Sequence, residues 1–165
     1  SYLPWVGRVL RQLVPVQPHP GSYLGGGSYR DNPGAVTLAF TGPDSALGLA
    51  ANLAHECSHQ HYHLLRTAGR VDDGSDTALY YSPFVKKERD IATIVMTYHA
   101  FANEALVART AELASIPDPY AASRGPQIRA TLQPLVEILE KNRALTPLGV
   151  ALWRPVHQRL ERAFA

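Results

Sequence analysis

At 165 residues the chain has the length of one domain, and its composition of 45% hydrophobic and 18% charged residues is that of a globular protein. The net charge of +2, without a long Lys or Arg run, argues against a nucleic-acid partner. Cys57 is the single cysteine, which leaves no internal disulfide, and the sequence shows neither a membrane-spanning apolar stretch nor a signal peptide. We therefore expect one cytoplasmic domain over residues 1–165, with no membrane partner.

The N-terminal quarter of the chain carries helix, loop and strand signals in turn. Residues 1–14 place apolar side chains at helical spacing, and the prolines from Pro15 onward predict the end of this helix. Residues 21–28 are rich in glycine and predict a loop or an edge strand. Residues 35–40, bounded on both sides by Gly and Pro, are the best strand candidate in the chain.

The rest of the chain is mainly helical. Asp44 or Ser45 is the predicted N-cap of a helix that ends near Ala68, where Gly69 is the predicted stop. A polar loop follows. Further helices are predicted over residues 91–114, 126–142 and 147–164. We therefore expect a predominantly helical α+β fold in which one helix packs on a small β-sheet.

The helix predicted to end near residue 68 carries His55-Glu56-Cys57-Ser58-His59, a complete H-E-x-x-H pattern. Residues four apart lie on one face of a helix, so His55 and His59 can both reach one metal ion. Glu56 lies about 100° further round the helix, where it could orient or deprotonate a metal-bound water. We predict a metal site on a zincin-like core, with Glu56 as its catalytic residue. The alternative is a histidine-rich helix whose imidazoles make surface hydrogen bonds.

A catalytic metal usually has three protein ligands and an open position, so a third ligand is expected. Two candidates lie on the next predicted helix. His99 stands among apolar residues, where the alternative is a buried histidine held by hydrogen bonds. Glu104, within Asn103-Glu104-Ala105, is similar to the second motif of thermolysin-like zinc peptidases, in which a Glu on a following helix completes the site. We predict His99 as the third ligand and keep Glu104 as the alternative.

Residues 33–106 extend the pattern beyond the metal motif. The strand candidate, the metal motif, Tyr-Tyr-Ser-Pro at 80–83 and His-Ala-Phe at 99–101 follow one another in this order. In this respect the chain resembles the 2-oxoglutarate-dependent His-Glu-x-x-His peptide β-hydroxylases, which are encoded near ribosomally made peptide natural products. It differs from their pattern at Phe84-Val85, where the family has Trp-Arg, and at Met96, where family members carry a histidine.

The resemblance implies a reaction, its cofactors and a substrate. It implies iron(II), 2-oxoglutarate and oxygen, and hydroxylation at Cβ of a side chain in a ribosomal precursor peptide. It carries His55 and His59 over as iron ligands and offers Arg89, whose planar fork suits a carboxylate, for the far end of 2-oxoglutarate. Tyr80 or Tyr81 could bind the co-substrate or line the peptide groove. The other cations that could bind the carboxylate are Lys86, Lys87, Arg66 and Arg109.

Two further functions stay open from the residues alone. A zinc metallopeptidase would use Glu56 as the general base that activates a zinc-bound water. A non-catalytic binding module would instead be stabilised by a fully ligated metal. We predict the iron(II)- and 2-oxoglutarate-dependent peptide hydroxylase; because the chain is short, a separate protein could recruit the peptide for it.

Overall fold

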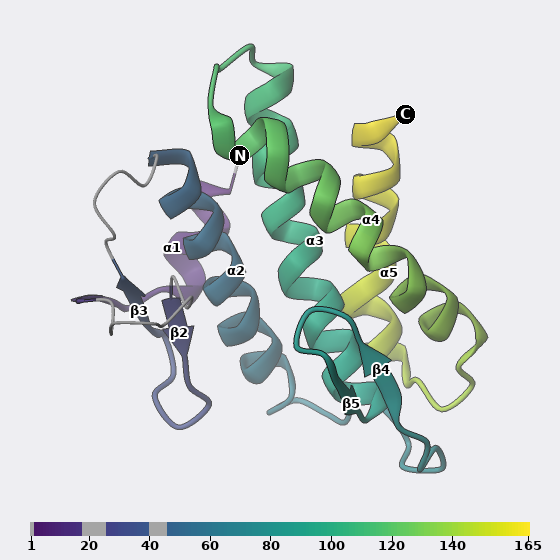
Figure 1. Ribbon diagram of the computed structural model, residues 1–165. Coiled ribbons are helices and arrows are strands. Elements are labelled where there is room, and N and C mark those ends of the chain that lie inside the picture. The colour runs from purple at the N-terminus through teal and green to yellow at the C-terminus, as the bar shows by residue number, and fades with distance from the viewer. Residues whose placement is uncertain (1, 18–25, 40–45) are drawn as a thin grey trace.

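The computed structural model of the protein describes residues 2–17, 26–39 and 46–165. This part of the chain forms a predominantly helical α+β fold with a small mixed β-sheet, which confirms the predicted fold class at that level (Figure 1). The elements, in chain order, are α1 (Leu3–Val9), β1 (Gln12–Val16), β2 (Gly26–Ser28), β3 (Ala35–Ala39), α2 (Ala46–Leu65), β4 (Tyr80–Ser82), β5 (Lys87–Arg89), α3 (Ile91–Leu113), α4 (Pro119–Lys141) and α5 (Pro147–Phe164).

The small sheet has β3 at its centre, as expected for the strand with the most buried residues. It pairs in parallel with β1, with Leu13 opposite Val36, and antiparallel with β2, with Gly27 opposite Thr37. Val36 and Leu38 are buried, and they meet Cys57 of α2 in a small apolar cluster. The strand β2 is therefore an edge strand that lies beside α2.

Helix α2 lies between the sheet and the other long helices (Figure 1). Its side opposite the sheet packs on α3, where the Tyr62 hydroxyl donates a hydrogen bond to the carbonyl oxygen of Ala92 over 2.9 Å. This central position explains why α2 buries Glu56, Ser58 and Gln60 although they are polar. Such groups need hydrogen-bond partners when they leave water. Neighbouring elements supply partners for Glu56 and Gln60, whereas the Ser58 hydroxyl donates to the carbonyl oxygen of Ala54 within α2.

The three C-terminal helices form the main apolar core. Each begins at a side chain that accepts a hydrogen bond from the first turn, namely Asp90, Asp118 and Thr146. Trp153 and Leu135 are among the largest fully buried side chains between them. Helix α3 is long and apolar enough to cross a membrane by length and composition alone, but most of that stretch is buried inside the protein, as in the central helix of a folded core.

Several predicted boundaries differ from the structure. The predicted helix over residues 1–14 is wrong beyond Val9, because the chain turns into β1 and pairs with β3. Helix α2 ends at Leu65, before the predicted stop at Gly69, while its predicted caps at Asp44 and Ser45 lie outside the described residues. The third difference is α4, which begins at Pro119 and continues through Pro126, where a helix start was predicted.

The β4–β5 hairpin was not predicted. It places Tyr80 opposite Arg89 and Ser82 opposite Lys87, and Lys86 occupies the turn with a positive φ of 51°. In Figure 1 this hairpin lies in front of the lower end of α3. It brings the Tyr-Tyr-Ser-Pro segment onto the helix that follows the metal motif.

Candidate metal centre

The two histidines of the motif face each other from successive turns of α2. Their Nε2 atoms are 3.1 Å apart, and their rings meet edge to face with centroids 4.8 Å apart. Two nitrogens bound to one ion at about 2.1 Å lie about 3.0 Å apart in octahedral and about 3.4 Å apart in tetrahedral geometry. The observed separation falls between these values, so both Nε2 atoms suit one metal ion.

His59 is in the protonation state that metal binding requires. Burial lowers its pKa to about 3, and the positive charges of neighbouring histidines add to this effect. A neutral imidazole offers a lone pair to a metal without first losing a proton. The Nδ1 atom of His59 is buried and has no hydrogen-bond partner among the described residues, so nothing on that side fixes the ring.

His55, in contrast, is fixed from behind by Glu104 of α3. Its Nδ1 atom donates a hydrogen bond to Oε2 of Glu104 over 2.9 Å. With the proton on Nδ1, the lone pair of the neutral ring lies on Nε2, which is the nitrogen that faces His59. A carboxylate in this position is the usual outer partner of a metal-binding histidine.

Glu104 is itself held by α4. Its Oε1 accepts a hydrogen bond from the Tyr120 hydroxyl over 2.6 Å and a second from Arg124 Nε over 3.3 Å. Burial alone would raise the pKa of Glu104, but the hydrogen bonds and positive charges around it hold the pKa below its ordinary value. Glu104 is therefore an ionised, buried carboxylate whose hydrogen bonds join it to His55, Tyr120 and Arg124. Sequence reasoning did not find Tyr120 and Arg124.

Glu56 lies on the sheet side of α2. Its Oε2 atom accepts a hydrogen bond of 2.7 Å from Ser28 Oγ at the end of the edge strand β2. Burial raises the pKa of Glu56, although the charge of His55 and the bond from Ser28 act in the opposite direction. A Cβ atom at Gly26 would lie 3.0 Å from Cγ of Glu56, so the glycine lets the strand approach this side chain closely.

His99, the predicted third ligand, has hydrogen-bond partners other than His55 and His59. It is buried on α3, where its Nδ1 donates to the carbonyl oxygen of Leu152 over 2.9 Å, and its Nε2 lies 3.2 Å from Nδ1 of His61. Burial lowers the pKa of His99 to about 4, and the charge of His61 adds to this. Both nitrogens are thus engaged, Nδ1 with α5 and Nε2 with His61 of α2. Its ring would have to turn away from these partners to join His55 and His59.

The predicted co-substrate residues lie on the β4–β5 hairpin. The Tyr80 hydroxyl donates to Asp76 over 2.7 Å, and this bond is the main cause that raises the pKa of Tyr80. Tyr81 is more than half exposed, and Arg89 has no ion pair with a described carboxylate. None of the three forms a hydrogen bond, ion pair or ring contact with His55 or His59 among the described residues.

A column of aromatic rings joins the same hairpin to His55 of the candidate site. Phe84, the residue after Tyr-Tyr-Ser-Pro, stacks on Phe101 with ring centroids 3.6 Å apart and an angle of 12°. Phe101 in turn contacts the ring of His55 edge to face, with centroids 4.5 Å apart. Because Phe101 is part of the His-Ala-Phe stretch, two separated pieces of the sequence pattern meet at His55.

Comparison with known proteins adds no relative: no family model, no curated protein and no solved structure matches the chain. Within the described residues, no group of three or more His, Cys, Asp or Glu side chains is arranged to hold a metal ion together. The candidate centre therefore consists of the facing pair His55 and His59, the carboxylate of Glu104 behind it and the carboxylate of Glu56 beside it.

Proposed function

We propose that the protein is a metal-dependent enzyme that modifies a peptide, with His55 and His59 as ligands of the metal. The observation that carries this proposal is the 3.1 Å separation of their Nε2 atoms, with Nδ1 of His55 held by a buried carboxylate. A surface histidine-rich helix would have no need of the second feature. We further propose that α2 and the sheet beside it form a zincin-like core.

For the reaction, we propose oxygen- and 2-oxoglutarate-dependent hydroxylation of a peptide side chain. In the thermolysin-like arrangement the second-helix Glu would share the metal with both histidines, but Glu104 lies on the Nδ1 side of His55, away from His59. A metal held by the two histidines keeps several positions open, as a co-substrate and oxygen require. The contacts from Phe84 through Phe101 to His55 bring the Tyr-Tyr-Ser-Pro hairpin close to His55, which supports a role for this hairpin in the proposed reaction.

Iron(II) with 2-oxoglutarate would supply the oxidation of the C–H bond, and the residues of the chain would hold and orient the participants. His55 and His59 would bind the metal, with His99 as the predicted third ligand and Glu104 as the alternative. Arg89 would bind the far carboxylate of 2-oxoglutarate. Phe84 and Phe101 would exclude water from one side of the site. Glu56 would orient a water or a peptide group through its bond to Ser28.

A zinc peptidase is the second candidate, and one observation favours it. Glu56 is a buried carboxylate with a raised pKa next to an edge strand, which are properties of a general base for hydrolysis. A peptide could add to that edge strand as a further strand and present its carbonyl to a zinc-bound water. The hydroxylase and the peptidase therefore differ in their metal, iron or zinc, and in whether Glu56 must accept a proton.

The test uses Glu56→Gln beside the wild-type protein. Each is incubated with iron(II), ascorbate, 2-oxoglutarate and the peptide encoded beside the gene, and succinate and peptide mass are measured. We expect succinate and a peptide heavier by one oxygen atom from the wild type, with measurable turnover left in Glu56→Gln because no step needs this residue to accept a proton. Peptide cleavage with zinc in the absence of oxygen, abolished by Glu56→Gln, would establish the peptidase instead.

A further inference from the structure

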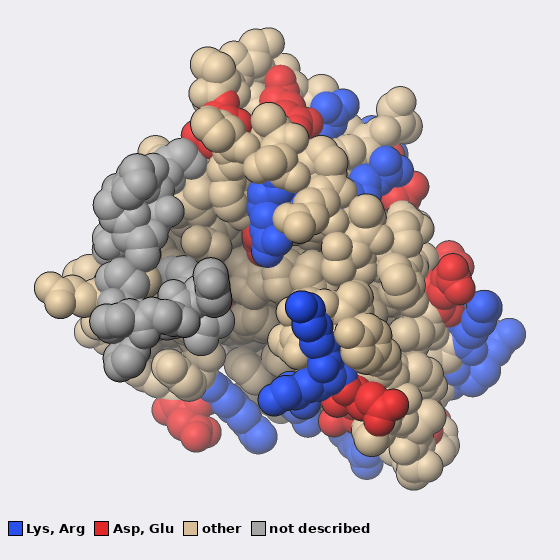
Figure 2. Space-filling model, viewed as in Figure 1, with Lys and Arg blue, Asp and Glu red and all other residues tan. Residues whose placement is uncertain are grey.

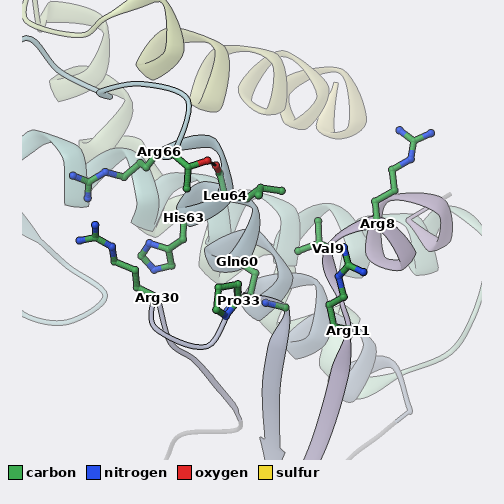
Figure 3. A pocket seen from close by; sticks show the side chains of 11 residues that line it. Arg8, Val9, Arg11, Arg30, Pro33, Gln60, His63, Leu64 and Arg66 are labelled. Carbon is green, nitrogen blue, oxygen red and sulfur yellow. Dashed lines mark hydrogen bonds between the residues drawn. The ribbon is translucent and has the colours of Figure 1, made fainter.

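A cavity of about 330 Å³ lies one turn beyond the metal motif, at the C-terminal end of α2 (Figure 3). Its polar lining comes from elements far apart in the sequence. The contributors are Arg8 and Arg11 from the N-terminal segment, Arg30 from the connection before β3, and Gln60, His63 and Arg66 from α2 and its end. His63 follows His59 by four residues, so this cavity histidine lies about 6 Å along the helix from the second proposed metal ligand.

The charge around this cavity is strongly one-sided. Four arginines line it, and no Asp or Glu in the described part of the chain does. None of these four guanidinium groups forms an ion pair with a described carboxylate. Arg66 lies 5.8 Å from the centroid of the Tyr62 ring and also acts on the Tyr62 hydroxyl. Asp31, next to Arg30 in the sequence, is close enough to act on His63 but does not line the cavity. Such a group of like charges lowers its free energy by taking up an anion.

His63 provides a ring nitrogen that no described protein group uses as a hydrogen-bond partner. Its Nδ1 atom is buried and has no hydrogen-bond partner among the described residues. Arg30 and Arg66 both act on this imidazole, and Figure 3 shows the three side chains gathered at one end of the cavity. A neutral imidazole with a free N–H between two guanidinium groups is suited to a carboxylate oxygen.

Gln60 shapes the cavity without taking part in recognition. Its Oε1 accepts a hydrogen bond of 2.8 Å from the Gly34 amide, and its Nε2 donates to the carbonyl oxygens of Tyr29 and Ala35. The side chain is therefore saturated, and it fixes the loop before β3 against α2. Recognition of a ligand is left to the arginines and His63.

The spread of the arginines indicates the kind of ligand. Arg30 and Arg66 stand at one end of the cavity, whereas Arg8 and Arg11 stand at the other end (Figure 3). A single small anion would draw the guanidinium groups together around one point. Cations at both ends suit an extended chain that carries several carboxylates.

We propose that this cavity is the docking site for an acidic segment of the peptide substrate, with Asp or Glu side chains bound by Arg30, Arg66 and His63. The inference rests on the proposed function, because that function supplies the peptide. Docking one turn beyond His59 would place the neighbouring part of the same peptide at the metal centre. The specificity of the enzyme would then depend on where acidic residues lie relative to the modified residue.

The test measures fluorescence anisotropy with a labelled peptide of Glu, Gly and Ser, and with a matched peptide in which Gln replaces Glu. We expect the wild-type protein to bind the acidic peptide, more weakly as salt is added, and to bind the Gln peptide at least about tenfold more weakly. Arg30→Gln combined with Arg66→Gln should weaken acidic-peptide binding by about tenfold or more. The matched control, Arg143→Gln with Arg162→Gln, removes two exposed charges outside the cavity and should leave binding within about twofold.

Unchanged binding in the Arg30/Arg66 double variant would overturn the proposal. So would loss of 2-oxoglutarate binding in this variant, measured by calorimetry, while acidic-peptide binding stays intact, because the cavity would then serve the co-substrate. Metal content and succinate formation are measured on the same proteins. If only the docking proposal is wrong, metal content and succinate formation stay as expected while the anisotropy result fails. If the proposed function is wrong, metal content and succinate formation are absent while acidic-peptide binding is unaffected.

Discussion

Both ring nitrogens of His55 have a partner, and the partner of one nitrogen decides which nitrogen carries the proton. Because Nδ1 donates to Glu104, Nε2 carries the lone pair and faces His59. The sequence could predict the facing pair because a four-residue spacing on a helix is local information. It could not predict that Tyr120 and Arg124 hold Glu104, since that contact depends on how α4 packs on α3.

The position of Glu104 leads to a prediction for Glu104→Gln. An amide cannot supply the negative charge that orients His55 and strengthens it as a ligand, so metal affinity should fall by about 10- to 100-fold. The site should still fill at saturating metal, because both Nε2 atoms remain. Competition titration with a zinc chelator measures this change. Glu112→Gln removes a carboxylate of the same helix that pairs with Arg109, and should leave the affinity unchanged.

Complete loss of the site in Glu104→Gln, even at saturating zinc, would show that Glu104 is itself a ligand. That result would support the thermolysin-like arrangement. An affinity equal to that of the wild type would contradict the orienting role altogether.

At the level of elements, a long apolar run was sufficient to predict a helix and its bounds, whereas short or proline-containing segments were not. Helix α3 was predicted to within a residue or two because its apolar run is long and Asp90 caps it. The N-terminal segment failed because its apolar residues also suit a strand, and pairing with β3 decides between the two. Helix α4 passes through Pro126, which local rules treat as a boundary rather than an interior position.

Two glycines in helices provide an element-scale prediction. A Cβ atom at Gly149, in the first turn of α5, would collide with the carbonyl oxygen of Val71, so Gly149→Ala should lower the free energy of unfolding by about 1–3 kcal/mol. At Gly7 of α1 a Cβ atom would meet nothing within 4 Å, so Gly7→Ala should raise the free energy of unfolding by about 0.5–1 kcal/mol. Urea denaturation measures both. Equal effects of the two substitutions would contradict the close approach of α5 to Val71.

At the level of the whole molecule, the sequence predicted the fold class but not the surfaces that the fold assembles. Composition and periodicity indicate a helical α+β protein in which the helix with the His-Glu-x-x-His pattern lies next to a strand, and α2 does pack beside the small sheet. The arginine cavity draws on three regions whose meeting no local pattern reveals. Figure 2 likewise shows Lys and Arg side chains beside a hollow on the face seen there, although the sequence has no long basic run.

The central claim is that His55 and His59 together bind one metal ion, and the metal content of protein purified without oxygen tests it most directly. Elemental mass spectrometry should find about one divalent metal ion per chain in the wild type and almost none in His55→Ala or His59→Ala. His63→Ala is the matched control: it removes the next histidine along the same stripe of α2 and should keep the metal. Full metal occupancy in His55→Ala or His59→Ala, or equal loss in all three variants, would contradict the account.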